Sequence, residues 1–426
     1  MTPGINLQQT LSRTTLAVGD EPQLIYVLLE AHAEGLAQQL PKLPLNLCLV
    51  IDRSSSMRGE RLMQVKDAAA RIVDQLGQDD YFSLVVFNDR ADVVIPAQRA
   101  IKKSDLKAAI TQIEAAGGTE MAQGMALALQ EVQRPFLTRG ISRIILLTDG
   151  RTYGDESRCV EIARRGQSRG IGLTALGIGT EWNEDLLETM TASENSRAQY
   201  IATAQDVVKV FADEVTRLHA IFAQQVQLSV ETRPGALLRS LDQVRPFIAP
   251  ITIVEEAERR WVANLGDWPD TGVQGFLLEV VVPPLPVGDH PVLKLTLRYH
   301  LPGANLRDQA RELLVRLSLR PAEEVAYHVD ATVKHWLERL VAYRLQASAW
   351  KHAAEGRFEE ASERLQMAGT RMLNVGDASL AHTLQQEATR ILRNGTVSEE
   401  GRKRIRFGTR GLMGPVAGDE RETGTG

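Results

Sequence analysis

The chain has 426 residues, of which 43% are hydrophobic and 24% charged, and a formal net charge of −5. This mildly acidic balance gives no reason to expect a nucleic-acid-binding or membrane-surface protein. Residues 1–6 contain no basic segment followed by an apolar stretch, and no apolar run reaches the roughly eighteen residues of a membrane-spanning helix. We therefore expect a cytoplasmic protein of several domains.

Apolar, strand-like runs alternate with amphipathic helical patterns from residue 45 to residue 218. This alternation is typical of an open, mostly parallel sheet with helices on both faces. The expected strands are residues 45–51, 81–87, 92–96, 142–148, 171–178 and 199–202, and the expected helices are residues 60–77, 103–114, 121–134, 155–169, 183–191 and 205–218. The connection at 88–90 is too short for a helical crossover, so we expect an antiparallel edge strand after it. With the common order 3-2-1-4-5-6, the first and fourth strands are neighbours where the winding reverses and ligands bind.

Polar oxygen-bearing side chains follow these two strands. Asp52, Ser54 and Ser56 come after the first strand, Thr119 follows a glycine pair before a helix, and Asp149 ends the fourth strand. Hydroxyl and carboxylate oxygens without nearby His or Cys favour a hard divalent cation. We expect Mg²⁺ in an octahedral shell near about 2.1 Å that keeps several waters, with Mn²⁺ and Ca²⁺ as alternatives. If the three hydroxyls bind directly and the two carboxylates act mostly through water, the ligands that touch the ion are largely neutral. The ion then still attracts an anionic ligand.

The pattern Asp-Xaa-Ser-Xaa-Ser, then Thr after Gly-Gly, then Asp in Thr-Asp-Gly resembles the metal-ion-dependent adhesion site of von Willebrand factor type A domains. Every motif position matches, and the similarity covers residues 44–218. The resemblance implies a protein-interaction module, not an enzyme, in which the metal binds a Glu or Asp of an unknown partner protein. The whole chain is also similar to bacterial proteins that carry this domain near the N-terminus, followed by a β-domain and a helical tail.

Simpler interpretations remain open for the single motifs. Asp and Ser are common in turns and at helix starts, and Thr119 can cap the helix that follows it. Arg53 and Glu120 lie beside the candidate ligands, where they are either solvated or influence the choice of partner. An alternative function is that of a subunit in a ring-ATPase assembly, as some von Willebrand A proteins have.

A Mg²⁺-dependent phosphatase of the haloacid dehalogenase type is a second alternative. That chemistry needs a general-acid Asp two positions after the nucleophile, where this chain has Ser54. The sequence contains no Gly-Xaa4-Gly-Lys-Ser/Thr loop, which argues against an intrinsic nucleotide hydrolase.

The flanks of the α/β region predict further domains. Residues 8–33 form a β-rich run that needs a partner, and residues 223–320 show the strand alternation of an antiparallel β-sandwich. We therefore expect a doubly wound, mostly parallel six-stranded α/β domain at 41–220. It would be inserted between β-strands of residues 1–40 and a β-sandwich domain at 221–320.

The last hundred residues predict helices and a tail. The expected helical bundle covers residues 321–395, with helices at 323–354, 358–373 and 378–392. Residues 396–426 are expected to form a basic and then disordered tail. Its basic run, residues 399–410, is expected to be solvated and not to bind nucleic acid, and Thr409 within it is a candidate phosphorylation site. Cys48 in a strand and Cys159 in a helix are expected to be buried thiols without a disulfide.

Overall fold

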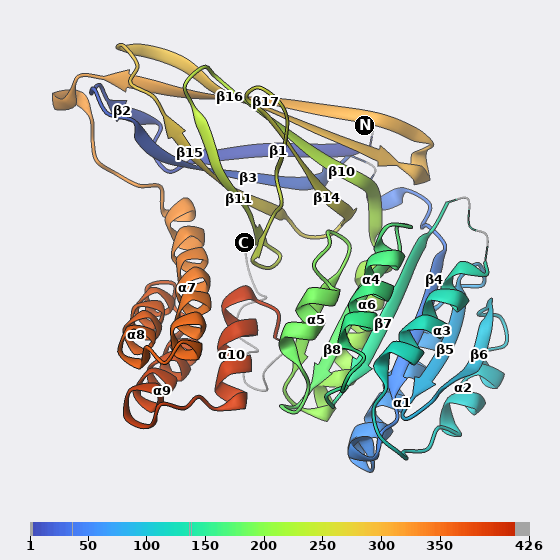
Figure 1. Ribbon diagram of the computed structural model, residues 1–426. Coiled ribbons are helices and arrows are strands. Elements are labelled where there is room, and N and C mark those ends of the chain that lie inside the picture. Colours follow the sequence, from blue (N-terminus) through green and yellow to red (C-terminus); the bar gives the residue numbers. More distant parts are fainter. Residues whose placement is uncertain (1–2, 36, 136, 138, 414–426) are drawn as a thin grey trace. The chain divides into compact units, whose positions relative to one another are not determined.

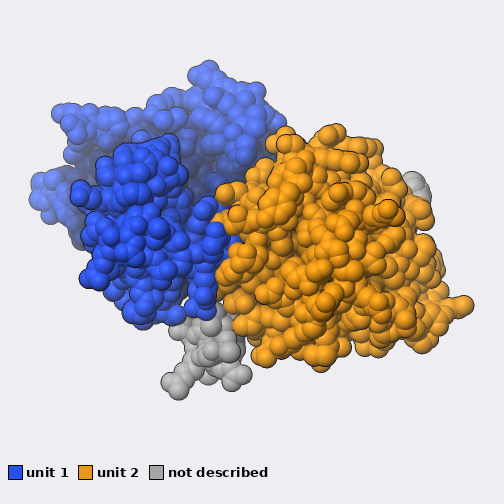
Figure 2. All heavy atoms as spheres, turned by 60° about the horizontal axis from the view of Figure 1, so that its bottom comes forward, with its two compact units in different colours: residues 1–41, 221–411 blue, residues 42–220, 412–426 orange. Residues whose placement is uncertain are grey.

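The computed structural model describes residues 3–35, 37–135, 137 and 139–413. The chain divides into two compact units, which Figure 2 shows in separate colours. Unit 1 comprises residues 1–41 and 221–411, and unit 2 comprises residues 42–220 and 412–426. Residues 42–220 of unit 2 are therefore inserted into the sequence of unit 1.

Unit 2 is built on a six-stranded sheet with the order β6-β5-β4-β7-β8-β9 (Figure 1). The strands are β4 (Leu45–Asp52), β5 (Tyr81–Phe87), β6 (Ala91–Arg99), β7 (Ile141–Thr148), β8 (Gly172–Ile178) and β9 (Arg197–Ile201). All neighbours pair in parallel except β5 and β6, which are antiparallel. The predicted order and the antiparallel edge strand are both confirmed. Every residue of β4 is buried, because helices cover both faces of a parallel sheet, so its sequence shows no alternation.

The helices of unit 2 lie in two groups. They are α1 (Glu60–Gln75), α2 (Lys103–Thr111), α3 (Met121–Gln133), α4 (Glu156–Gln167), α5 (Glu184–Met190) and α6 (Val207–His219). Helix α1 packs with α2 and α6, whereas α4 packs with α3 and α5. This is the doubly wound α/β arrangement that the sequence predicts. The loops after β4 and β7 therefore reach the same edge of the sheet, at the carboxyl ends of the strands.

Unit 1 contains two further sheets, which share one hydrophobic core. Their orders are β1-β3-β15-β11-β12 and β13-β14-β10-β16-β17-β2. The strands are β1 (Gly4–Leu11), β2 (Thr15–Ala17), β3 (Gln23–Glu34), β10 (Ile221–Thr232), β11 (Leu237–Arg245), β12 (Ala249–Pro250), β13 (Val254–Ala257), β14 (Arg260–Pro269), β15 (Gln274–Val282), β16 (Gly288–Leu301) and β17 (Leu306–Arg320). Pairings are antiparallel except for β2 with β17. The β-rich segment before the parallel sheet thus contributes strands to both sheets.

Four helices follow the last strand: α7 (Ala331–Ala354), α8 (Phe358–Asn374), α9 (Ala378–Asn394) and α10 (Glu399–Arg410). Helix α7 starts later than the expected residue 323. The side chain of Asp330 accepts hydrogen bonds from the backbone of Thr332 and Val333 and so caps the helix. Residues 322–324 form only a short 3₁₀ turn. Helix α7 packs Val333 and Leu340 against the five-stranded sheet, and α7–α10 share a second core.

The basic run expected as a solvated tail forms helix α10 instead. Ser398 caps it by accepting a hydrogen bond from the backbone of Gly401, and Lys403 and Phe407 are fully buried. Thr409 is also buried, and its hydroxyl donates to the carbonyl of Ile405, so it is not an accessible phosphorylation site in this fold. The disorder expected from residue 414 onward lies outside the described residues.

Both cysteines are buried and free, as predicted. Among the described residues, no helix combines the length and the apolar character that crossing a bilayer requires. The expected fold class is therefore confirmed: an α/β domain with a mostly parallel sheet, antiparallel sheets and a C-terminal helical bundle.

Candidate metal site at the carboxyl edge of the sheet

Three loops of unit 2 are joined at the carboxyl edge by hydrogen bonds. The backbone N and the Oγ of Ser55, after β4, both donate to the carbonyl of Gly117 at 3.0 Å. The backbone N of Gly118 donates to Oδ1 of Asp89, after β5, at 2.9 Å. Gly117 has a φ of +79°, and a Cβ there would lie 2.3 Å from Oδ2 of Asp89. Only glycine fits at this position, and the glycine pair thereby brings the next loop residue, Thr119, to the site.

Oxygens from two separate segments, the end of β4 with its following turn and the loop before α3, surround Gly150, which follows β7. A Cβ atom placed on Gly150 would lie 3.4 Å from Oγ1 of Thr119. It would lie 3.9 Å from Oγ of Ser56 and 4.0 Å from Oδ2 of Asp52. One carboxylate and two hydroxyls therefore lie around one small space beside Gly150, which a side chain at this position would occupy. We call this space the oxygen cradle.

The remaining candidate ligands border the oxygen cradle. Oγ of Ser54 lies 3.0 Å from Oγ of Ser56, and Oγ of Ser56 donates to Oδ1 of Asp149 at 2.7 Å. Two octahedral ligands at about 2.1 Å and at right angles are about 3.0 Å apart, so the two serine oxygens have the spacing of neighbouring Mg²⁺ ligands. Because Ser56 donates its proton to Asp149, its oxygen accepts the hydrogen bond from Ser54 with one lone pair and keeps the other available to a cation. The donor set therefore fits a hard divalent ion.

Asp52 is fully buried and held from both sides. Its Oδ1 accepts a hydrogen bond from the backbone N of Ser54 at 2.8 Å, and its Oδ2 accepts one from Oγ1 of Thr148 at 2.7 Å. Burial raises the pKa of Asp52 to about 6, although these hydrogen bonds act in the opposite direction, and the nearby Asp149 raises it further. A buried carboxylate of this kind is stabilised by any cation that enters the oxygen cradle.

Asp149 is fully buried as well, and its second oxygen pairs with a cation of the chain itself. Nη1 of Arg61, in the first turn of α1, lies 2.5 Å from Oδ2 of Asp149. The Arg61 side chain is 40% exposed, whereas that of Asp149 is 0% exposed. The site therefore already holds one positive charge without an ion.

A second hydrogen-bonded group supports Thr119. Oγ1 of Thr152 donates to the carbonyl of Thr119 at 3.1 Å and also contacts the carboxylate of Asp155. Oδ2 of Asp155 accepts from the backbone N of Ala122 at 2.7 Å, in the first turn of α3. The loop after β7 thus fixes both the start of α3 and Thr119, two positions before that helix.

The structure brings all the sequence-predicted residues, Asp52, Ser54, Ser56, Thr119 and Asp149, to one place; binding of an ion by them stays a prediction. Arg53 pairs with Asp92 at 2.5 Å, and the exposed Glu120 accepts from Gln123, so neither enters the oxygen cradle.

Sequence reasoning missed Thr148 and Arg61. A basic residue in the first turn of a helix is electrostatically unfavourable, and this was the one signal that pointed to a partner for Arg61. In the described part of the chain, no three or more His, Cys, Asp or Glu side chains are grouped to hold a metal. The candidate site is consistent with that, because only two of its five residues are carboxylates and the other three carry hydroxyls.

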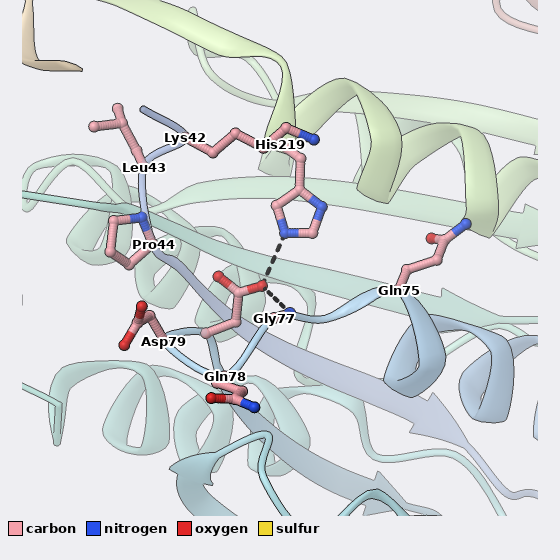
Figure 3. Close-up of a pocket in the computed structure, with 9 residues that line it drawn as sticks. Lys42, Leu43, Pro44, Gln75, Gly77, Gln78, Asp79 and His219 are labelled. Carbon is pink, nitrogen blue, oxygen red and sulfur yellow. Dashed lines mark hydrogen bonds and ion pairs between the residues drawn. The ribbon is translucent and has the colours of Figure 1, made fainter. Parts of the chain in front are cut away.

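A pocket of ≈ 340 Å³ lies at the opposite, amino edge of the same sheet (Figure 3). It is lined by Lys42, Leu43, Pro44, Gln75, Gly77, Gln78, Asp79, Asp80 and His219. Asp80 accepts hydrogen bonds from the backbone of Leu45 at 2.8 Å and of Gly77 at 2.7 Å, and pairs with His219. These contacts hold the start of β4 and the end of α6 together, which indicates a structural role for this edge.

Two family models match the chain. The von Willebrand factor type A domain model matches residues 46–214. The model of the Sll0103-like, C-terminal alpha-helical domain matches residues 331–415. The first match covers the parallel sheet with the candidate metal site, and the second begins at the first residue of α7.

Two bacterial relatives are similar in sequence. The chain is 30% identical to the uncharacterized protein sll0103 of Synechocystis over 378 residues, which cover 88% of this chain and 89% of that protein. It is 28% identical to the uncharacterized protein YfbK of Escherichia coli over 195 residues, which cover 45% of this chain and 34% of that protein. The match to sll0103 therefore extends across both units.

Two solved structures share the fold over almost the whole chain. A von Willebrand factor type A protein from Catenulispora acidiphila has a TM-score of 0.74 at 19% identity, with 95% of this chain and 96% of that chain covered. The ArnB paralog VWA2 from Sulfolobus acidocaldarius has a TM-score of 0.53 at 14% identity, with 96% and 98% covered. At these identities the likeness concerns the fold alone.

Proposed function

Because the chain belongs to the sll0103-like family of von Willebrand factor type A domain proteins, we propose that it is a metal-dependent protein-interaction module. The observation that carries the proposal is the oxygen cradle at Gly150, where Asp52 and Ser56 from one segment meet Thr119 from another. The ligand spacing and the lack of His or Cys favour Mg²⁺.

Each candidate ligand has a separate role in the proposal. Ser54, Ser56 and Thr119 would hold the ion through their hydroxyls, and Asp52 and Asp149 would orient its waters and balance its charge. When bound, the ion would supply one open coordination position for an anionic ligand. We propose that a Glu or Asp of a partner protein takes this position, because carboxylate oxygens are the preferred anionic ligands of Mg²⁺ in proteins.

We further propose that the site does not catalyse a reaction. A phosphatase of the haloacid dehalogenase type would need a general acid where Ser54 stands. Ser54 Oγ is engaged with Ser56 Oγ, and a serine hydroxyl is too weak an acid for that role. Purified protein with Mg²⁺ should therefore leave p-nitrophenyl phosphate unhydrolysed, and turnover that disappears in Asp52→Ala would contradict this part of the proposal.

Metal binding is tested by thermal unfolding of the full chain with and without Mg²⁺. An ion that binds only the folded state raises the unfolding temperature by mass action. We expect such a rise in the wild type and none in Asp52→Ala. Asp74→Ala is the matched control, since Asp74 is a surface carboxylate on α1 that pairs with Lys107. An equal rise in wild type and Asp52→Ala would refute the assignment.

Partner binding is tested with proteins captured on the immobilised chain from its own host. A carboxylate bound directly to the ion should be released by chelator but retained in moderate salt, because such a bond is not screened like a surface ion pair. Asp52→Ala should capture no such protein. Retention of the same proteins in excess chelator would place the interaction elsewhere on the chain.

A further inference from the structure

Arg61 is tied to the oxygen cradle through Asp149. Its Nη1 lies 2.5 Å from Oδ2 of Asp149 and 3.5 Å from the carbonyl of Ser56. The other oxygen of Asp149 accepts the hydroxyl of Ser56 at 2.7 Å. Asp149 thus connects a candidate ligand on one side to a guanidinium on the other, and none of these contacts requires a metal ion.

The positive charge of Arg61 is in an electrostatically unfavourable position, which its ion pair with Asp149 compensates. It lies in the first turn of α1, where the helix dipole disfavours a positive charge. Its Nη2 reaches the loop after β8, where a Cβ on Gly179 would lie 3.6 Å from it. The guanidinium is therefore held between the loops that follow β7 and β8. The fully buried carboxylate of Asp149 offsets the unfavourable helix position, because a buried charge needs an opposite charge beside it.

This pairing changes the charge of the loaded site. The carboxylates of Asp52 and Asp149 together would neutralise a divalent ion, so the loaded site would have no net charge to attract a further anion to the open position. Arg61 cancels the charge of Asp149, so a site that holds the ion retains one positive charge. One additional carboxylate restores neutrality.

We propose that Arg61 converts the metal-loaded site into a receptor for a single carboxylate group, and that it does so by weakening the hold on the metal itself. The inference rests on the proposed function and extends it by naming the residue that selects an anionic partner. Two effects of Arg61 weaken metal binding. Its positive charge repels the ion, and it already neutralises Asp149 when no ion is bound. Arg61 strengthens the binding of an anion, because its positive charge adds to that of the metal ion.

The test measures ion and anion binding separately on the full chain. Mn²⁺ affinity is read from the electron paramagnetic resonance signal of the free ion. Acetate binding to the Mn²⁺-loaded protein is read from water-proton relaxation, which falls when acetate displaces a metal-bound water; chloride at equal ionic strength is the reference. The variants are Arg61→Gln, which removes the charge, and Arg61→Lys, which keeps it. Arg58→Gln is the matched control, because Arg58 is an exposed arginine just before α1.

Arg61→Gln should bind Mn²⁺ roughly tenfold more tightly than the wild type, the scale of a unit charge acting on a divalent ion across a few ångströms in high dielectric. It should bind acetate several-fold more weakly. Arg61→Lys and Arg58→Gln should stay near the wild type in both measurements. Arg61→Gln leaves the buried carboxylate of Asp149 without its counter-charge, so circular dichroism checks that this variant is folded, whereas Arg61→Lys keeps the charge.

The possible failures are distinguishable. Weaker or unchanged Mn²⁺ affinity in Arg61→Gln, or unchanged acetate affinity, overturns the role of Arg61 while the metal site stands. Wild-type protein that binds no Mn²⁺, or binds it no better than Asp52→Ala, overturns the proposed function itself.

Discussion

Nε2 of His219 lies 2.9 Å from Oδ2 of Asp80, at the edge of the sheet opposite the candidate metal site (Figure 3). His219 is the last residue of α6 and Asp80 directly precedes β5. The same carboxylate accepts hydrogen bonds from the backbone N–H groups of Leu45 and Gly77. Burial would raise the pKa of Asp80, but the hydrogen bonds from His219 and the backbone outweigh it, and the pKa is lowered. The ionised carboxylate therefore stabilises the folded state.

Asp80→Ala should destabilise the protein without changing metal affinity. It leaves the buried backbone N–H of Leu45 without this acceptor, which costs about 1–3 kcal/mol, whereas the N–H of the exposed Gly77 can bind water instead. Urea unfolding should show the loss, and Mn²⁺ affinity should remain that of the wild type because the site lies at the other edge. Asp79→Ala is the control: its side chain is 82% exposed and its contact with Arg99 is long, so little change is expected. Equal stability of the two variants would contradict the role given to Asp80.

Glu214 predicts a loss of stability in acid. It is fully buried on α6 and accepts from Arg217 at 2.8 Å and 3.0 Å, from Oγ1 of Thr174 at 2.6 Å, and from Arg197. Burial would raise its pKa, but the two arginines and these hydrogen bonds outweigh it, so the pKa is lowered. In the unfolded chain it titrates near about 4.3, so its contribution is fully present above that pH and is lost as the pH falls toward the folded pKa.

Glu214→Gln should remove this part of the pH dependence. At neutral pH the substitution leaves Arg197 buried without its carboxylate, which we expect to cost about 3–5 kcal/mol. Below about pH 4 the difference between wild type and variant should shrink, because Glu214 then binds a proton in the unfolded wild-type chain but not yet in the folded one, which lowers the free energy of unfolding of the wild type. Urea unfolding over a pH series checks both statements, and profiles that run parallel over the whole range would rule out the assigned role.

Both thiols should be unreactive while the protein is folded. Burial raises the pKa of Cys48 to about 12, and burial together with Asp155 and Glu156 raises the pKa of Cys159. Only the thiolate reacts, so iodoacetamide at pH 8 should label neither residue in the native protein and both in urea. Variants with a single cysteine, Cys48→Ala and Cys159→Ala, assign any labelling that mass spectrometry detects. Rapid labelling of either thiol without denaturant would contradict its buried position.

Gly150→Ala should impair metal binding at little cost to the fold. The added methyl group would meet oxygens of Thr119, Ser56 and Asp52 at 3.4–4.0 Å, which are ordinary contact distances, but it would fill the oxygen cradle. We expect Mn²⁺ affinity to fall at least about tenfold while stability changes by less than about 1 kcal/mol. Gly19→Ala, where a Cβ meets nothing within 4 Å, is the control. Unchanged Mn²⁺ affinity in Gly150→Ala would show that the ion binds elsewhere or not at all.

The sequence alone determined the α/β core and the positions of the candidate ligands. A short, largely apolar run bounded by turn residues, such as β4, is typical of a strand covered on both faces, and helical periodicity between such runs leads to a doubly wound sheet. The order of that sheet then places Asp52 and Asp149 at one edge. These features follow from local periodicity and general topology, so no knowledge of particular distant contacts was needed.

Only the tertiary structure decided the remaining features. Asp330 caps the start of helix α7, but several other polar residues lie nearby in the sequence. The local pattern does not show which of these side chains accepts hydrogen bonds from the backbone of the first helical turn. The basic run of α10 becomes a helix because Ile405 joins the core of the bundle and Arg410 binds the carbonyl of Ile248 at 2.9 Å. A charge run has no local signal for such contacts.

The pairing of Arg61 with Asp149 is the clearest case, since 88 positions separate the two residues in the chain. Periodicity reports which side of an element is buried, whereas the neutralisation of a buried charge depends on which distant side chain the fold brings beside it. Sequence therefore identified the oxygens of the candidate site, and the fold determined their counter-charge.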